Sequence, residues 1–597
     1  MRERAEKLLL SLTVSAITFL LFHEAVGFGF SNCDDVSYLL VHPEVKNGLS
    51  PEGVKWAFTY VGDAIWMPLT WMSYMLDYTL GHGFGGMHLV SNLVHALNAA
   101  LLSLLLFRLF PRLNRLLVLL AALVWAVHPL RVESVVWLAS RKDVLSTFFL
   151  LLALITWFGE RKFPLLSFLF LSLGALAKPS VMVFPVFAIP IDLVIRRQAK
   201  PWWTYLAAIL LSAAIAIEGG LAQNLGGAMD PLDWTPLWYR CLNAVAAISV
   251  YFGNFLLPVD LAPQCQLRYP SMPRVSLLGA VPMAVFAALL LGFARRTLHP
   301  ALRELGSLKS PAELAGWFRR TVDAVPGPSI GILVFLVALV PFLGVVGFGY
   351  HAFADRFTIL PAIGLSVFIL SVLEDVRGPK RTLSAACALL AFVAFLGTMT
   401  VRQVSFWEND GRLYDHTVAV DGEGNTMALS IAASYYYEFE HDLEKTRTRL
   451  AKVLDRPDGL LLFGSLGHLY MESVCVAGDM KAADDCMGWL IKWLHHARRL
   501  HRERSGDLRE GWSTEYLVAD AMRLAFTPGM LDVAEERLRE LQRTAPRHPA
   551  VRVLAYRIAE RRGDAAEIAV RLKECADCEG DPYFANRWAR DAKTPRP

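Results

Sequence analysis

The feature that most constrains this chain is a series of uninterrupted apolar blocks. Several approach the length of about 20 residues with which a helix crosses the hydrocarbon core of a bilayer. They are apolar throughout rather than striped, which is typical of helices that face lipid. The sequence therefore predicts an all-α, polytopic membrane helical bundle. The main blocks are Leu8–Phe28, Leu89–Phe107, Leu116–Val127, Val144–Phe158, Leu277–Phe293, Ile330–Gly349 and Leu383–Thr400.

The composition agrees with a membrane protein and argues against a nucleic-acid partner. The chain has 597 residues, of which 54% are hydrophobic and 19% are charged, too many apolar residues for a single soluble core. The net charge is only +4, and the basic residues separate the apolar blocks instead of forming a stripe with interleaved aromatics. Nucleic acid is therefore not an expected partner.

The distribution of Lys and Arg predicts the sidedness of the chain. Basic residues gather on the cytoplasmic side of short loops, and alternating the sides gives about eleven spans, with the block Leu242–Leu257 left as interfacial or re-entrant. Residues 1–401 would form the membrane domain, with an outer loop at 30–87 and its C-terminus outside. The predicted inside clusters are Arg2 to Lys7, Arg108 to Arg115, Arg161 and Lys162, Arg196 to Lys200, Arg295–Arg320 and Arg377–Arg381.

Residues 402–597 differ in composition and predict a soluble helical domain on the outer side. Gly529 and Gly563 are 34 residues apart, as are Leu538 and Leu572, which is the period of tetratricopeptide (TPR) helix pairs. Two unrelated helical hairpins with coincidental spacing are the alternative. In an oxidising compartment, the cysteine pairs of this domain favour structural disulfides over a metal or redox site: Cys475 with Cys486, and Cys575 with Cys578.

Two adjacent acids, Asp34 and Asp35, follow the outer end of the first predicted span. One interpretation is a helix cap at the start of a loop helix, a place that Asp favours. The other is a general base, Asp34, with a second acid that shifts its pKa or helps to hold a cation. The sequence leaves both interpretations open.

Several basic residues occupy loops that should lie outside, against the usual preference for the inside. They either pair with neighbouring acids, among them Glu133, Asp143 and Asp355, or bind an anion such as a lipid phosphate. Lys178, in otherwise apolar sequence, is the strongest candidate for the second role. The basic residues are Arg131, Arg141, Lys142, Lys178 and Arg356.

The histidines and the nucleotide-binding and hydrolase motifs exclude several kinds of site. His88, His95 and His128 have no carboxylate at ligand spacing, so structural hydrogen bonds are expected rather than a metal site. No Gly-rich phosphate loop, Rossmann fingerprint or GxSxG nucleophile elbow is found in the strand–turn–helix context that such a motif requires. Nucleotide-driven and serine-hydrolase chemistry therefore have no support.

Several segments, in order, resemble the multi-span glycosyltransferases of the GT-C fold, and within them bacterial relatives of the transmembrane and TPR-containing O-mannosyltransferases. The resemblance covers about Met1–His416, and the repeat-like tail agrees in kind. The loop Gln264–Pro270 matches only in outline. The segments that carry the resemblance are Cys33–Tyr38, Trp66–Asp77, Met87–Ala99, His128–Ser146, Leu176–Pro185 and Phe353–Leu365.

The resemblance implies an inverting transfer of a hexose, as in mannosyltransferases, from a polyprenyl-phosphate carrier to a hydroxyl of a protein or envelope glycan. It also implies a bacterial inner membrane with the C-terminal domain in the periplasm, where that domain could bind the acceptor. Asp34 would be the general base, assisted by Asp35. A divalent cation such as Mg²⁺ or Mn²⁺ is left open. The phosphate would be bound by Arg141, Lys142, Lys178 and Arg356, with Tyr38, His88, His128, Glu133 and Asp355 in support.

Two other function classes remain as alternatives. One is a non-catalytic membrane scaffold that recruits partners through its TPR-like domain. The other is a transporter of lipid-linked glycans, which would be expected to carry charges near mid-bilayer and to show related halves. The charged groups here lie at the predicted outer ends of the spans, and the acid pair is intact, so the enzyme is favoured.

Overall fold

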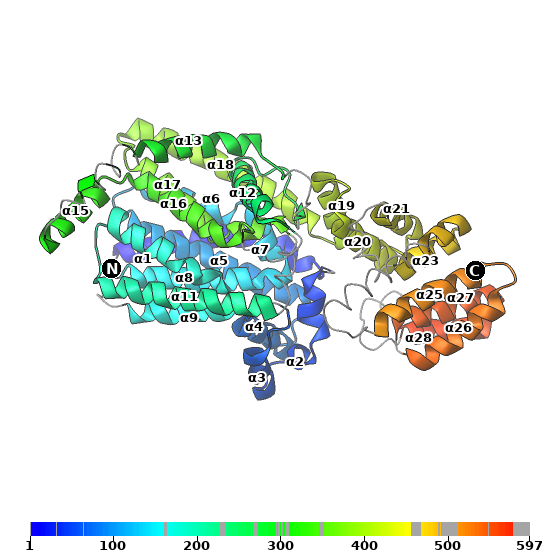
Figure 1. The fold of residues 1–597 in the computed structure, drawn as a ribbon. Coiled ribbons are helices and arrows are strands. Elements are labelled where there is room, and N and C mark those ends of the chain that lie inside the picture. Colours follow the sequence, from blue (N-terminus) through cyan, green and yellow to red (C-terminus); the bar gives the residue numbers. More distant parts are fainter. Residues whose placement is uncertain are drawn as a thin grey trace. The chain divides into compact units, whose positions relative to one another are not determined.

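The computed structural model of the protein divides into two compact units, residues 1–408 and 409–597, each described here by itself. Figure 1 shows both as packed helices. The prediction of an all-α protein is confirmed over the described residues, apart from two short strands. The structure describes residues 2–31, 33–63, 65–159, 164–225, 235–263, 265–266, 273–293, 295, 299, 303–304, 310–345, 351–454, 467–487, 490, 510–546 and 548–576.

The first unit is built around long apolar helices that pack side by side. Helix α5 lies between α1 and α8, and α9 packs on the other side of α8 (Figure 1). A second group joins α6 to α17 and α18, and α16 to α17. The long helices are α1 (Arg2–Leu21), α5 (Phe84–Leu109), α6 (Arg115–Ala126), α8 (Arg141–Trp157), α9 (Leu165–Ala177), α11 (Trp202–Leu225), α12 (Leu237–Leu256), α13 (Leu277–Phe293), α15 (Pro311–Asp323), α16 (Gly327–Leu339), α17 (Ala362–Leu373) and α18 (Pro379–Phe406).

Several of these helices could span a membrane. Among the described residues, α5, α11 and α18 are long and apolar enough to do so, and two bent helix pairs bring the number to five if each pair is one span. One pair joins α6 to Pro129–Val136 at 51°, and the other joins Gly316–Asp323 to Gly327–Phe342 at 91°. The eleven spans expected from the sequence stay a prediction. The block Leu242–Leu257 lies largely in α12 and is not among these candidates.

Ion pairs bring together segments that the sequence predicts to lie inside. Arg115, at the start of α6, pairs with Glu6 in α1, and Arg197 lies 3.8 Å from Asp323 at the end of α15. The helix ends in each pair therefore lie close together. The predicted inside residues Arg161 and Lys162, and most of the loop Gln264–Pro270, lie outside the described residues.

The segment after α1 forms a small helical layer at one end of the bundle. It contains the π-helical turn η2 (Val36–Val41) and the short helices α2 (Pro43–Lys46), α3 (Pro51–Thr59) and α4 (Pro68–Thr79). Helix α4 packs against α2, α3 and α9, and these short helices lie together beside the long helices in Figure 1. Thr70 donates a hydrogen bond to the Ala177 carbonyl at 3.0 Å, which fixes α4 beside Lys178.

Short elements between the long helices carry most of the predicted site residues. The chain runs through η3 (Pro129–Arg131), α7 (Val132–Val136) and η4 (Leu138–Ser140) before α8, and through η5 (Pro179–Val183), α10 (Phe184–Pro190) and η6 (Ile191–Ile195) after α9. Strands β1 (Cys265–Gln266) and β2 (His351–Phe353) pair antiparallel, and η10 (Asp355–Thr358) follows β2. Turns η1 (His23–Gly27) and η9 (Val340–Phe342) complete the unit.

The second unit is a succession of helices in which each packs mainly on its neighbours in the chain. Gly529, between α25 and α26, and Gly563, between α27 and α28, both have φ near +75°, a conformation that favours glycine. The 34-residue spacing therefore relates two helical hairpins that turn in the same way. The elements are α19 (Asp410–Asp421), α20 (Thr426–Tyr435), η11 (Tyr436–Glu440), α21 (Leu443–Leu454), α23 (Gly467–Val476), α25 (Glu510–Phe526), α26 (Leu531–Thr544), α27 (Pro549–Arg562) and α28 (Ala565–Ala576).

The expected Cys475–Cys486 disulfide is wrong, because both cysteines are free thiols. They are buried in the apolar core of the second unit, and the Cys475 sulfur lies 3.7 Å from that of Met471. Burial raises the pKa of Cys475 to about 12 and that of Cys486 above its usual range. The two thiols thus act as small apolar side chains. Cys578 of the other expected pair lies outside the described residues.

Candidate functional site

The two adjacent acids occupy different environments. Asp35 is 1% exposed, and its carboxylate accepts hydrogen bonds from the Ser31 amide at 2.9 Å and the Ala139 amide at 2.6 Å. Asp34 is partly exposed, and the hydrogen bond described for it comes from the Cys33 thiol at 3.7 Å. Asp35 therefore joins residues 30–87, the predicted outer loop and called the outer segment below, to η4, while the carboxylate of Asp34 is partly exposed.

Lys142 lies in a buried cluster of charges beside Asp34. Its ammonium donates a hydrogen bond to the Tyr38 hydroxyl at 3.0 Å and lies 4.5 Å from the centre of the Tyr38 ring. It also interacts electrostatically with the four other charged groups around it. These are Asp34, Asp143, Lys178 and Arg356.

Lys178 enters the same cluster from the junction of α9 and η5. Its ammonium lies 2.5 Å from Asp143 Oδ1, and the two side chains are 10% and 4% exposed. Because the pair is almost closed to solvent, its attraction is weakly screened and holds the lysine in place.

Arg356, in η10, completes the cationic side of the cluster. Its guanidinium pairs with Glu133, and its backbone amide donates to the same carboxylate at 2.8 Å. The guanidinium also lies over the Trp137 ring, 5.2 Å from its centre, and Nη2 lies 3.2 Å from His351 Nε2. Burial and the Arg356 charge lower the pKa of His351 to about 3, so its neutral imidazole accepts this hydrogen bond.

Asp355 contributes little negative charge to this cluster. Burial and repulsion from Glu133 raise the pKa of Asp355 well above its ordinary value, even though Arg131 and Arg356 lie nearby. By contrast, burial alone would lower the pKa of Arg356, but attraction to Glu133 and Asp143 outweighs this and raises it. With Asp355 neutral, Lys142, Lys178 and Arg356 around Asp34 face the carboxylates of Glu133 and Asp143, so the cations outnumber these two acids by one.

Arg141, predicted to bind phosphate with Lys142, has a different environment. Its side chain is 0% exposed and pairs with Asp77, and it donates to Ser91 Oγ at 3.2 Å and to the Met87 carbonyl at 2.8 Å. The guanidinium is thus surrounded by protein partners. These contacts favour a structural role for Arg141, and its predicted contact with a phosphate stays a prediction.

The two predicted supporting histidines bond to the backbone. His88 Nε2 lies 2.7 Å from the Gly29 carbonyl oxygen, and His128 Nε2 lies 3.0 Å from that of Phe255. His128 also stacks on the Phe255 ring. These contacts agree with the expected structural hydrogen bonds and tie together helices and loops around the cluster.

Some buried polar atoms in or beside this cluster have no hydrogen-bond partner among the described residues. They include Asp143 Oδ2, Arg131 Nε and Nη1, and the indole nitrogens of Trp71 and Trp137. Trp71 packs against Tyr38, and Trp137 against Arg356. Buried polar atoms without partners are uncommon in folded proteins, and a bound polar molecule is one way to satisfy them.

A second polar cluster, not found from the sequence, lies in the outer segment. The Ser37 hydroxyl donates to Asp63 Oδ1 at 2.7 Å, the Tyr60 hydroxyl donates to Oδ2 at 3.2 Å, and His42 Nε2 lies 3.2 Å from Oδ2. Trp56 stacks on Tyr60 at 4.5 Å. We refer to Ser37, His42, Trp56, Tyr60 and Asp63, with Trp71 behind them, as the outer-loop cluster. In the sequence, the high density of aromatic residues in 56–74 is the one sign of this cluster.

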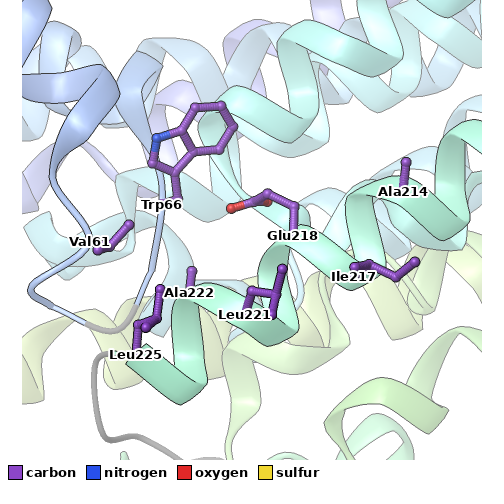
Figure 2. A pocket seen from close by; sticks show the side chains of 8 residues that line it. All are labelled: Val61, Trp66, Ala214, Ile217, Glu218, Leu221, Ala222 and Leu225. Carbon is purple, nitrogen blue, oxygen red and sulfur yellow. The ribbon is translucent and has the colours of Figure 1, made fainter.

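A groove of about 480 Å³ lies between the outer segment and α11. Figure 2 shows that the carboxyl group of Glu218 extends toward the Trp66 ring amid apolar side chains. The Trp66 indole itself donates to the Phe58 carbonyl at 2.9 Å. The groove is lined by Val61, Trp66, Ala214, Ile217, Glu218, Leu221, Ala222 and Leu225.

The described residues contain no group of three or more His, Cys, Asp or Glu side chains that could hold a metal ion. Asp35, which the sequence suggested as a helper in cation binding, accepts two backbone hydrogen bonds instead. The residues described here therefore identify no ligand set for the divalent cation that the resemblance left open.

Comparison with known proteins gives one partial similarity. No family model matches the chain, and no solved structure matches it. A stretch of 145 residues is 30% identical to the Protein O-mannosyl-transferase Tmtc2 of Drosophila melanogaster, covering 22% of this chain and 14% of that protein. The chain thus shares a distant, partial similarity with a protein named as a glycosyltransferase.

Proposed function

We propose that this protein is an integral membrane glycosyltransferase of the GT-C fold that transfers a sugar from a polyprenyl-phosphate carrier to a hydroxyl acceptor on the outer face of the membrane. The observation that carries the proposal is the partly exposed Asp34 beside the buried cations Lys142, Lys178 and Arg356. One open carboxylate next to a positively charged site suits a reaction that removes a proton and releases a phosphate. The partial similarity to an O-mannosyltransferase supports the same class.

In this reaction Asp34 takes the proton of the acceptor hydroxyl as the hydroxyl oxygen attacks the anomeric carbon of the donor sugar. The bond between the anomeric carbon and the phosphate oxygen breaks, and polyprenyl phosphate leaves with the electron pair. The single displacement inverts the configuration at the anomeric carbon. No step is assigned to a metal ion.

The cations act on the leaving phosphate. Arg131, Lys142, Lys178 and Arg356 bear positive charge, against the carboxylates of Glu133 and Asp143 in the same cluster. Asp143 and Glu133 hold Lys178 and Arg356 in fixed positions, so little rearrangement is needed as negative charge develops on the phosphate. Arg131 is fully buried and would act through the field of the cluster rather than by contact.

The groove along α11 supports a donor with a lipid chain. Seven of its eight lining residues are apolar, and α11 is itself a candidate membrane span. The lining residues on its other side are Val61 and Trp66 of the outer segment. A polyprenyl chain in this groove would remove apolar surface from water while its phosphate reached the charged cluster.

The second unit supports a role in acceptor binding. Its stacked helical hairpins, with equivalent glycine turns at Gly529 and Gly563, are consistent with a TPR-like repeat. We propose that it lies in the periplasm of a bacterial cell and presents the acceptor.

The decisive experiment incubates the purified protein in nanodiscs with a panel of polyprenyl-phosphate sugars and measures release of the lipid phosphate. We expect release with at least one donor, and its loss in Asp34→Asn, whose amide cannot take a proton. Glu52→Gln, an exposed acid-to-amide change in the same segment, is the matched control and should keep wild-type activity. A panel in which no donor releases lipid phosphate, with a folded protein, would overturn the proposal.

A further inference from the structure

The outer-loop cluster combines aromatic rings with neutral and acidic hydrogen-bonding groups in a way that differs from the charged cluster. Its aromatic side chains come from α3, its C-terminal cap and α4: Trp56 and Tyr60 stack on each other, and Trp56 lies 5.3 Å from the Trp71 ring. Trp56 and Tyr60 remain partly exposed, whereas Trp71 is completely buried. A partly open aromatic surface is a suitable platform for a ring with apolar C–H groups.

The polar groups of the cluster are held in fixed directions. Asp63 accepts hydrogen bonds on both carboxylate oxygens, and its side chain is still 20% exposed. His42 contacts Asp63 and Tyr60 through Nε2, and no described residue is hydrogen-bonded to its Nδ1. The Trp71 indole nitrogen has no partner among the described residues. Asp63 and His42, which are partly exposed, therefore offer hydrogen-bonding groups at the edge of an aromatic surface, whereas the Trp71 indole is buried behind it.

The outer-loop cluster differs in charge from the cluster around Lys142, Lys178 and Arg356, where the donor phosphate is proposed to bind. Its named members include no lysine or arginine, and the hydrogen bonds from His42 and Ser37 help to keep Asp63 ionised. A phosphate would be repelled by that carboxylate. A neutral molecule with many hydroxyl groups would be accommodated, because the aromatic faces take its C–H surface while Asp63 and His42 bind its hydroxyls.

Tyr38 connects the outer-loop cluster with Asp34. Its ring packs 5.0 Å from that of Trp71, and burial together with the negative charges of both Asp34 and Asp63 raises the pKa of Tyr38 well above its usual range. The two carboxylates thus act on the same hydroxyl from different segments. A molecule bound at the outer-loop cluster would have to extend one hydroxyl past Tyr38 to meet Asp34.

We infer that the outer-loop cluster is the acceptor subsite and that the acceptor is a carbohydrate, bound as a pyranose over Trp56 and Tyr60 with its hydroxyls on Asp63 and His42. This inference rests on the proposed function and specifies its acceptor. An extended peptide, the other acceptor class, would be favoured by a sheet edge, and the described residues of 30–87 form helices and turns instead.

The experiment separates acceptor binding from donor chemistry. Methyl α- and β-pyranosides of common hexoses are titrated into the donor-free protein in nanodiscs, with binding followed by tryptophan fluorescence and by equilibrium dialysis. We expect saturable binding of at least one pyranoside, weakened about tenfold in Trp56→Leu, which corresponds to roughly 1.4 kcal/mol for the lost aromatic contact. Phe58→Leu, an exposed aromatic change in the same helix, is the control and should bind like wild type.

The second arm measures transfer from a donor that releases lipid phosphate, to the same pyranosides and to a Ser/Thr-rich peptide. Trp56→Leu and Asp63→Asn should raise the pyranoside KM about tenfold while the donor KM and the slow hydrolysis of the donor by water stay unchanged. Transfer to the peptide with no effect of either variant would overturn the inference, as would an equal effect on donor hydrolysis. If a pyranoside bound in the first arm but no donor was turned over, the proposed function would be refuted. The inference that the outer-loop cluster binds a carbohydrate would still be supported.

Discussion

The carboxylate of Asp35 accepts a hydrogen bond from the backbone amide of Ala139 at 2.6 Å, across 104 residues of sequence. With the second bond from the Ser31 amide, this contact fixes the start of the outer segment against η4. Asp34, one residue earlier, is therefore held at the edge of the charged cluster with its own carboxylate still open. Neighbouring acids thus take a structural and a proposed chemical role.

Exchanging each of these acids for its amide should separate the two roles. Asp34→Asn should lower the rate of sugar transfer by ~10²–10⁴-fold while donor binding stays within a few-fold of wild type. Asp35→Asn should instead lower stability by ~1–3 kcal/mol, because one amide N–H of the backbone loses its acceptor. Thermal unfolding and turnover measured on both variants test this, and full activity in Asp34→Asn would contradict it.

Two buried ion pairs should respond differently to neutralisation. Losing one charge of Arg141–Asp77 or of Lys178–Asp143 should cost ~3–5 kcal/mol of stability, since the partner is left charged and buried. The double variants Arg141→Gln/Asp77→Asn and Lys178→Gln/Asp143→Asn should recover most of that stability. Only the first should also recover wild-type donor binding.

The donor KM of the second double variant should remain raised, by an amount equivalent to ~1.5–3 kcal/mol for a charged contact with phosphate. Titration of the donor at fixed acceptor concentration gives this value. Recovery of wild-type donor KM by both double variants would mean that Lys178, like Arg141, only supports the fold.

The outer segment should loosen in acid. Burial alone would raise the pKa of Asp63, but its hydrogen bonds from His42 and Ser37 outweigh this and hold the pKa below its ordinary value. A carboxyl with a lowered pKa in the folded state stabilises the fold above its ordinary pKa of about 3.9, and this contribution is lost as the pH falls through the lower value. Limited proteolysis of 30–87 in a series of buffers from about pH 2 to about pH 6 should show this loss of stability. The dependence on pH should be weaker in Asp63→Asn.

Sidedness can be mapped with single cysteines. In a variant whose eight native cysteines are replaced by alanine, Lys55→Cys should react with an impermeant maleimide from outside and Lys380→Cys only from inside. A reporter fused after Pro597 should be active outside. A cytoplasmic tail would show that the odd number of spans is wrong and would separate the second unit from Asp34.

The thiols of Cys475 and Cys486 should be protected rather than oxidised. Both are buried, and burial raises the pKa of each, so little thiolate is present at neutral pH. A maleimide should label them in denaturant without prior reduction, and hardly at all in the native protein. If labelling required prior reduction, the two cysteines would form the disulfide that the sequence predicted.

The sequence by itself determined the helical architecture and the kind of chemistry to look for. Uniform apolar blocks such as Leu89–Phe107 can satisfy their backbone in lipid only as helices, and such local patterns need no knowledge of distant contacts. The sequence also identifies the acid pair and the basic residues in predicted outside loops, Lys142, Lys178 and Arg356. A charged residue in apolar sequence is energetically costly, so it stands out without knowledge of the fold.

Only the tertiary structure decided what each polar residue does. Asp34 and Asp35, or Arg141 and Lys142, are adjacent in the sequence and chemically alike, yet their partners come from segments far away: Ala139 for Asp35, Asp77 for Arg141, and Tyr38 for Lys142. The outer-loop cluster likewise exists only because α3, α4 and η2 pack together. The role of a buried polar group depends on which partners remain for it after folding, and these contacts have no local pattern in the chain.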